Sequence, residues 1–180
     1  MICIKKLSIN SAELDIVRAI YESSFPIDER RDFESIVALM SDNVCFQLEA
    51  IYSGNEVVGM LSSWQLDEWR YVEHFAIEAT KRGGGIGRDV LREYIERNDT
   101  PVVLEVEPPA DVYSRRRIAF YVSMGFVLHK DYRYVQPSYG EGREAVELLL
   151  MTCGAASGCN LDALSRLLHA RVYGVKYGVK

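Results

Sequence analysis

The sequence has no long apolar segment, and this shortage excludes one class of protein. No uninterrupted hydrophobic run in the 180 residues approaches the ~20 residues that a bilayer-spanning helix needs. The first residues also lack the charged start and long apolar stretch of a secretory signal. We therefore expect a soluble, cytoplasmic protein with no membrane partner.

Histidine and cysteine are also scarce. The four cysteines contain no C-x-x-C pair, and the three histidines are scattered along the chain. Zinc sites in proteins combine closely spaced cysteine and histidine ligands, whereas an isolated free cysteine behaves as a small hydrophobic residue. We expect reduced thiols and no metal site.

The charge balance excludes a further class of partner. Lys and Arg number 21 against 26 Asp and Glu, which gives a formal net charge of −5. A general nucleic-acid-binding surface needs a net basic face to neutralise phosphates. We expect no nucleic-acid partner, and the acidic balance favours cationic ligands such as amines.

What the sequence does contain is enough apolar material, 48% of its residues, to bury one substantial core. Hydrophobic periodicity predicts strands at residues 2–8, 44–52, 57–64, 71–77, 101–106, 126–135 and 145–152. It predicts helices from residue 11 to before Pro26, at 29–40, from 86, at 112–124 and from 160. This order is typical of an α/β or α+β fold with a mixed sheet and helices on both faces.

The most informative segment is the glycine-rich run from Lys81 to Arg88, which follows a predicted strand and precedes a predicted helix. Glycines leave the backbone amides bare, and the start of a helix is its positive end, so the two together form a cradle for an anion. Three consecutive glycines are also costly to order unless the bare backbone is needed. The run therefore predicts a site for a phosphorylated ligand.

Two familiar phosphate-binding patterns do not fit this run. A P-loop needs Lys followed by Ser or Thr after its last glycine, whereas Gly87 is followed by Arg88 and Asp89. A dinucleotide fingerprint, G-x-G-x-x-G, would place its third glycine on Arg88 if it began at Gly83. The run is therefore expected to be a phosphate-binding loop of a different type.

The R-x-x-G-x-G pattern of Arg82, Gly85 and Gly87 resembles the pyrophosphate-binding loop of the GNAT family of acetyl-CoA-dependent N-acetyltransferases. Downstream, the segment FYVSMGF from Phe120 to Phe126 is similar to the FYxxxGF segment of that family. The resemblance implies a GNAT-like fold with a central mixed, mostly antiparallel sheet. It also implies an acetyltransferase domain at residues 1–153. Residues 154–180 lie beyond that domain, and their pattern predicts a linker and an amphipathic helix that packs on the domain or on a partner.

The resemblance implies acetyl-CoA as co-substrate and assigns residues to it. The backbone of Phe75, Ala76 and Ile77 would bind the pantetheine amides. The backbone amides expected to hold the pyrophosphate are those of Arg82, Gly83, Gly84, Gly85, Ile86, Gly87 and Arg88.

Acetyl transfer to an amine needs a proton for the leaving thiolate and a base for an amine that arrives as ammonium. Tyr121 matches the family tyrosine that is often assigned as the general acid, and a phenol is protonated at neutral pH. Glu73 is the candidate base, because strand periodicity places it on the same face as Phe75. The same periodicity places His74 on the opposite face, which leaves it as a reserve base.

The acceptor site is expected between the link of the first two helices and the loop before the last strand, with Glu29, Arg30, Tyr134 and Tyr139 as its candidate residues. Acids and tyrosines suit an amine, but the arginines of these segments suit a carboxylate equally well. The acceptor therefore stays open.

The resulting prediction is an enzyme that transfers the acetyl group of acetyl-CoA to a primary amine of a small molecule or peptide, by direct attack in a ternary complex. The alternative is a non-catalytic acyl-CoA-binding or regulatory module, and a third option is a different acyl donor. A homodimer is the expected assembly, as is common in the family.

Overall fold

The computed structural model describes residues 2–97, 99–156 and 158–177. Its strands are β1 (Ile2–Lys6), β2 (Phe46–Ser53), β3 (Glu56–Leu66), β4 (Trp69–Ile77), β5 (Val102–Val106), β6 (Val127–Leu128), β7 (Tyr134–Gln136) and β8 (Val146–Cys153). Its α-helices are α1 (Leu14–Ser24), α2 (Phe33–Asp42), α3 (Ile86–Glu96), α4 (Val112–Ser123) and α5 (Leu161–Arg171). Short 3₁₀ turns, η1 (Ile27–Glu29) and η2 (Ala79–Lys81), follow α1 and β4.

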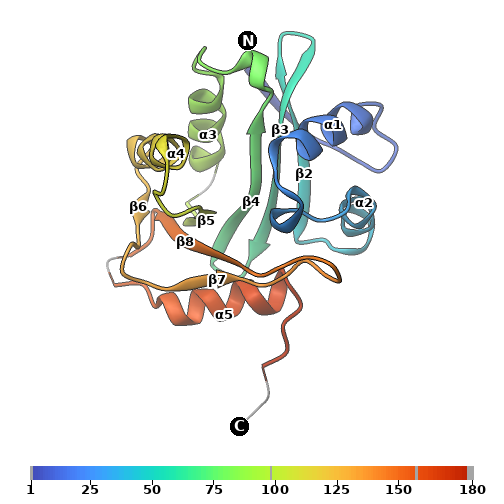
Figure 1. Cartoon of the computed structure of the whole chain (residues 1–180). Coiled ribbons are helices and arrows are strands. Elements are labelled where there is room, and N and C mark those ends of the chain that lie inside the picture. The colour runs from blue at the N-terminus through green and yellow to red at the C-terminus, as the bar shows by residue number, and fades with distance from the viewer. Residues whose placement is uncertain (1, 98, 157, 178–180) are drawn as a thin grey trace.

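The strands form one sheet in the order β1-β2-β3-β4-β5-β8-β6, with β7 pairing β8 (Figure 1). The β4–β5 pair is parallel and the other pairs are antiparallel. The connection from β4 to β5 carries α3, as parallel neighbours require. The expectation of a mixed, mostly antiparallel sheet is confirmed.

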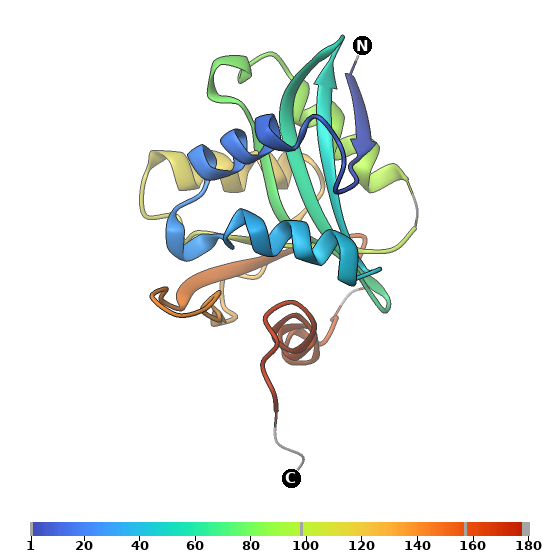
Figure 2. The same ribbon diagram turned by 90° about the vertical axis from the view of Figure 1, so that its right-hand side faces the viewer.

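Helices cover both faces of the sheet, and a hydrophobic cluster lies on each face (Figures 1 and 2). On one face α1 buries Val17 and Ile20, and α2 adds Ile36 to the same cluster, here named the acceptor-face cluster. On the other face α3 buries Val90 and Leu91 in a second cluster, here named the loop-face cluster. These side chains recur at helical spacing, so burial of one stripe on each helix fixes its place on the sheet.

The C-terminal helix α5 is part of the acceptor-face cluster. The Asn160 side chain accepts a hydrogen bond of 3.0 Å from the Ala163 amide at its first turn, as a helix N-cap does. Leu164 and Leu168 are buried in the cluster, as is Val172 just beyond the helix. Figure 2 shows α5 end-on beneath the sheet.

The predicted strand at 126–135 is wrong as one element, because it divides into β6 and β7. β6 pairs with Thr152 and Met151 of β8, while β7 pairs with the other end of β8, beginning at Leu148. Between them the chain turns at His129, whose carbonyl accepts from the Tyr132 amide at 3.2 Å. A single extended strand could not make this turn. Across residues 2–97, 99–156 and 158–177, no helix is both long and apolar enough to cross a membrane.

Candidate active site

Strands β4 and β5 part in the middle of the sheet. Their parallel register begins at Arg70 and Val102 and, within these two described strands, ends at Val72 and Leu104. β4 then continues to Ile77, paired on its other side with β3. The β4 backbone beyond Val72 therefore runs on without β5 as a ladder partner (Figure 1).

A β-bulge lies at this point and overturns one prediction about side-chain direction. Ser62 pairs with His74 and Ser63 with Val72, so Glu73 is the extra residue of the bulge. An extra residue breaks the alternation of faces along a strand. Glu73 and His74 consequently both approach Tyr139, and the expectation that His74 faces away from Glu73 is wrong.

Phe75, which was expected to share a face with Glu73, lies on the opposite face. It packs with the loop-face cluster, and the ring tip of Phe75 would lie 3.7 Å from a Cβ built on Gly87. Phe120 of α4 approaches the same point at 3.8 Å. The strand, the glycine loop and α4 therefore meet around Gly87.

The glycine loop forms an open N-terminal cradle on α3. Gly83 and Gly85 have φ angles of +88° and +84°, and a Cβ added to either, or to Gly84, would meet nothing within 4 Å. Gly85 is the N-cap of α3, and these three glycines are exposed. The amides at the start of a helix are not used by the helix itself, so this cradle can accept an anion.

The other residues assigned to the cradle flank it. Arg82 donates from its Nε to the Ile77 carbonyl at 2.7 Å and so ties the loop to the end of β4. Ile86 packs against the loop-face cluster. Arg88 is exposed on the first turn of α3, and its amide bonds the Gly85 carbonyl at 3.0 Å. The Arg88 side chain therefore lies in solvent beside the cradle.

Tyr121 lies in the loop-face cluster on α4, 8% exposed and in ring contact with Phe120 and Phe126. No residue in the described part of the chain hydrogen-bonds its hydroxyl. Burial raises the pKa of Tyr121 to about 12, against a weaker opposing effect of Arg117. The phenol therefore keeps its proton throughout the neutral range.

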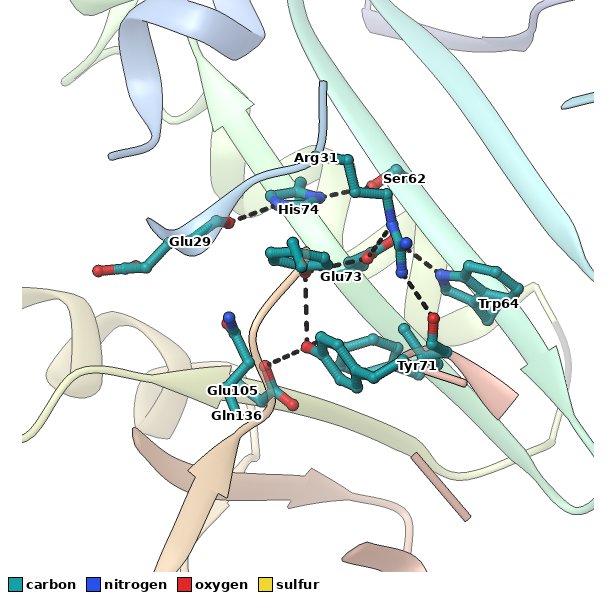
Figure 3. A network of polar contacts seen from close by, with 12 residues as sticks. Glu29, Arg31, Ser62, Trp64, Tyr71, Glu73, His74, Glu105 and Gln136 are labelled. Carbon is teal, nitrogen blue, oxygen red and sulfur yellow. Dashed lines mark hydrogen bonds and ion pairs between the residues drawn. The ribbon is translucent and has the colours of Figure 1, made fainter. Parts of the chain in front are cut away.

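The Glu73 carboxylate has no exposed surface and is bound from three directions. Arg31 pairs with it at 3.0 Å, the Trp64 indole donates at 2.7 Å, and the Tyr139 hydroxyl donates at 3.0 Å (Figure 3). Burial alone would raise the pKa of Glu73, but Arg31, His74 and the two hydrogen bonds outweigh it and lower the pKa. Glu73 is thus held as an anion, and its lowered pKa makes it a weak base.

His74 is fixed at both ring nitrogens. Its Nε2 donates to the Glu29 carbonyl at 2.9 Å, which leaves Nδ1 to accept from the Ser62 hydroxyl at 3.1 Å (Figure 3). Burial lowers the pKa of His74, although the Glu73 charge opposes it. The neutral ring anchors the η1 turn to the sheet.

Of the four candidate acceptor residues, Tyr139 and Tyr134 join this network by their side chains, and Glu29 and Arg30 do not. Tyr139 reaches Glu73, as described above, and Tyr134 is buried with its hydroxyl on Glu105. Arg30 donates to the Phe25 carbonyl at 3.2 Å. The Glu29 carboxylate points away from His74 (Figure 3), and burial raises its pKa, as do Glu107 and Asp28, while Arg117 lowers it.

The two loops expected at the acceptor site do meet. The Gln136 side chain donates to the Asp28 carbonyl at 3.3 Å, and Arg143 donates to the Ile27 carbonyl at 3.0 Å. The Glu144 amide reaches the Asp28 carboxylate at 3.1 Å. The link after α1 and the segment around β7 therefore form one wall.

Sequence reasoning missed Glu105 and Tyr173. Glu105 is the one acid inside the apolar strand β5, and this was the signal that could have drawn attention to it. Its carboxylate accepts from Tyr134 and, at 3.0 Å, from Tyr173. Tyr173 follows α5 in a tail whose sequence predicts no element, so only the tertiary structure brings it here.

Comparison with known proteins shows the family to which this fold belongs. The family model described as the acetyltransferase (GNAT) family matches residues 12–126. A structure described as a GNAT-family acetyltransferase from Bacteroides thetaiotaomicron is 31% identical, with a TM-score of 0.90, over 97% of this chain and 99% of that one. No curated protein sequence matches the chain significantly.

More distant structures share the fold. A ribosomal-protein-alanine N-acetyltransferase from Brucella melitensis has a TM-score of 0.61 at 23% identity, over 83% of this chain and 98% of that chain. A spermidine N-acetyltransferase chimera from Vibrio cholerae and hSSAT has a TM-score of 0.61 at 14% identity, over 84% of this chain and 94% of that chain. From the family match and the first of these structures, the chain belongs to the GNAT family of N-acetyltransferases.

Proposed function

We propose that this protein transfers the acetyl group of acetyl-CoA to a primary amine of a small molecule or peptide, by direct attack of the bound amine on the thioester. The observation that carries the proposal is the open glycine cradle at the start of α3, set beside the point where β4 and β5 part. Membership of the GNAT family supports acetyl-CoA as the donor.

The donor would lie against the β4 edge and the cradle. The amides of residues 83–87 would hold the pyrophosphate, with the Arg82 and Arg88 side chains as supporting charges. The Arg82 and Arg88 amides, which the sequence also assigned to the pyrophosphate, instead bond the Ala79 carbonyl at 3.4 Å and the Gly85 carbonyl at 3.0 Å. The backbone of Phe75, Ala76 and Ile77 would bind the pantetheine arm, because this edge of β4 has no ladder pair with β5. The cradle has room for a bulky anion, because Gly83, Gly84 and Gly85 have no side chains.

The charges of the acceptor wall favour a cationic substrate. Arg31 is neutralised by Glu73, and Arg143 pairs with Asp32. Glu29 and Glu105, by contrast, have no cation within ion-pair distance among the described residues. Arg30, on the same wall, bonds the Phe25 carbonyl and likewise has no acid within ion-pair distance among the described residues. The two carboxylates therefore outnumber the one cation, and an ammonium group would be attracted to them when both are ionised.

Tyr121 would supply the proton that the departing thiolate takes up. A buried phenol that keeps its proton at neutral pH can donate it as charge develops on sulfur. Glu73 was expected to be the base, and its ion pair with Arg31 argues that it holds the site together instead.

Replacing Tyr121 with Phe should lower kcat by about 100-fold, the usual contribution of one general acid. Affinity for CoA should stay within about twofold, because the hydroxyl would act only on the leaving sulfur. Steady-state assays of thiol release and calorimetric titration with CoA measure the two quantities.

The matched control is Tyr113→Phe on the same helix, where the tyrosine is 76% exposed. This variant should retain full turnover. Equal activity of the Tyr121 and Tyr113 variants would remove the acid role of Tyr121.

A further inference from the structure

Glu105 occupies a distinctive position in the sheet. It follows Leu104, the last residue of β5 that pairs with β4, and lies opposite Leu150 of β8. Leu150 belongs to the acceptor-face cluster, and side chains of directly paired residues share a face. The Glu105 carboxylate therefore faces the acceptor side at the point where the two central strands part.

The polar groups around Glu105 come from three other parts of the chain. Tyr134 of β7 donates to one carboxylate oxygen and Tyr173, after α5, donates to the other. Tyr71 of β4 contributes a third hydroxyl, and it lies 3.0 Å from the hydroxyl of Tyr173. The anion Glu73, on β4, is the charged group that acts on the pKa of Glu105, and it raises it.

These surroundings differ from those of Glu73 in one decisive respect. Glu73 is paired with the guanidinium of Arg31, whereas Glu105 is held by neutral hydroxyls and has no ion pair within the described chain. Each oxygen of an ionised carboxylate can accept two hydrogen bonds. After the bonds from Tyr134, Tyr173 and Tyr71, the carboxylate of Glu105 still has capacity for one proton.

We propose, resting on the function proposed above, that Glu105 is the general base that takes a proton from the acceptor ammonium, and that Tyr134 and Tyr173 position its carboxylate. The ammonium gives one proton to Glu105 and becomes a neutral amine. Its lone pair forms the N–C bond to the thioester carbonyl carbon, the C–S bond breaks, and sulfur takes the proton of Tyr121. The second proton lost from nitrogen restores the Tyr121 phenol, and Glu105 releases its proton to solvent.

This assignment gives the C-terminal segment a part in the reaction. Tyr173 also lies 3.4 Å from the hydroxyl of Tyr139, which in turn donates to Glu73. The Val172 carbonyl accepts from Arg31 at 2.7 Å, which fixes the backbone beside Tyr173. The tail after α5 thereby joins the anchored anion Glu73 to the proposed base through two hydroxyl groups.

The electrostatics agree with the geometry. Burial raises the pKa of Glu105 to about 7, against the lowering effect of the three tyrosine hydroxyls and with a further raising effect of Glu73. A base works best when its pKa lies near the working pH. Because the base must be ionised, activity should rise with pH through this value.

The first test is the pH profile of kcat/KM for Glu105→Gln. At pH 8 the variant should be about 100-fold slower than the wild type. The wild-type profile should also have an acid limb, a rise of kcat/KM with pH that ends near neutrality, and the variant should lack this limb. Glu107→Gln is the matched control, because it removes a carboxylate two residues along the chain that pairs with Arg117. The control should keep both the rate and the limb, and an acid limb that survives in Glu105→Gln would overturn the proposal.

Tyr173→Phe separates a positioning role from a merely structural one. Loss of a donor to the carboxylate destabilises its ionised form and raises its pKa, so the acid limb should move to higher pH while CoA affinity is unchanged. A limb that stays in place would overturn the role of Tyr173.

Infrared difference spectroscopy tests the assignment of Glu105 even if no amine is turned over. Absence of turnover would by itself count only against the proposed function. The wild type should show a protonated-carboxyl band that titrates near neutrality and disappears in Glu105→Gln. Titration of that band in the range of an ordinary glutamate would overturn Glu105 as the base.

Discussion

Replacing Arg31 with Ala should lower the free energy of unfolding by about 3–5 kcal/mol, because it leaves a buried carboxylate without its cation. Glu73 has no exposed surface, and Arg31 is its ion-pair partner at 3.0 Å. The same guanidinium also binds the Val172 carbonyl and so ties the C-terminal segment to the sheet. In a domain of this size, the midpoint of thermal unfolding should fall by about 10 °C.

Arg30→Ala is the matched control for this prediction. Arg30 is the neighbouring residue and makes one hydrogen bond, to the Phe25 carbonyl, so its loss should cost about 1 kcal/mol. Adding Glu73→Gln to the Arg31 variant should restore part of the loss, since it removes the stranded charge. Chemical denaturation of the four proteins measures these differences, and an Arg31 variant as stable as the Arg30 variant would contradict the account.

The pH dependence of that effect has a definite sign. The pKa of Glu73 is lowered in the folded protein from an ordinary value of 4.5, so its contribution to stability is present above this pH and is lost as the pH falls through the folded pKa. The difference between the wild type and the Arg31 variant should therefore narrow in acid.

Replacing Gly85 with Val should weaken acetyl-CoA binding by about 100-fold or more, since two charge-assisted hydrogen bonds lost from the cradle would cost about 3 kcal/mol. Gly85 has a φ of +84°, which a β-branched residue adopts only with strain. The substitution should distort the loop at the start of α3 and place a side chain where the cradle is open. Calorimetric titration with acetyl-CoA measures the loss.

Gly54→Val controls for the backbone strain itself. Gly54 lies in the turn between β2 and β3, with a φ of +63° and nothing within 4 Å of an added Cβ. It should cost stability through the same strain and leave acetyl-CoA affinity unchanged. If both variants bind equally well, the glycine loop is not the pyrophosphate site.

The sequence predicted the parts of this structure that depend on local pattern. The glycine loop before α3, Gly125 with its φ of +90° after α4, and the Asn160 cap of α5 are all set by residues close together in the chain. Periodicity also placed most strands, because each buries a regular set of apolar residues.

The remaining features depend on contacts between distant segments. The bulge at Glu73 moves His74 to the face of Glu73, and nothing in the local pattern marks the extra residue. The environment of Glu105 is built by Tyr71, Tyr134 and Tyr173, which lie far apart in the sequence. A carboxylate in an apolar strand could have been noticed, but its state depends on which groups surround it.

The measurement that tests the central claim most directly is calorimetric titration of the protein with acetyl-CoA and with CoA, followed by a thiol-release assay over a panel of primary amines. The account predicts micromolar binding of both ligands and turnover with at least one amine. Binding without turnover on any amine would count against the proposed transfer and favour a non-catalytic acyl-CoA-binding module. No binding of either ligand would contradict the assignment of the glycine loop, on which the proposed function rests.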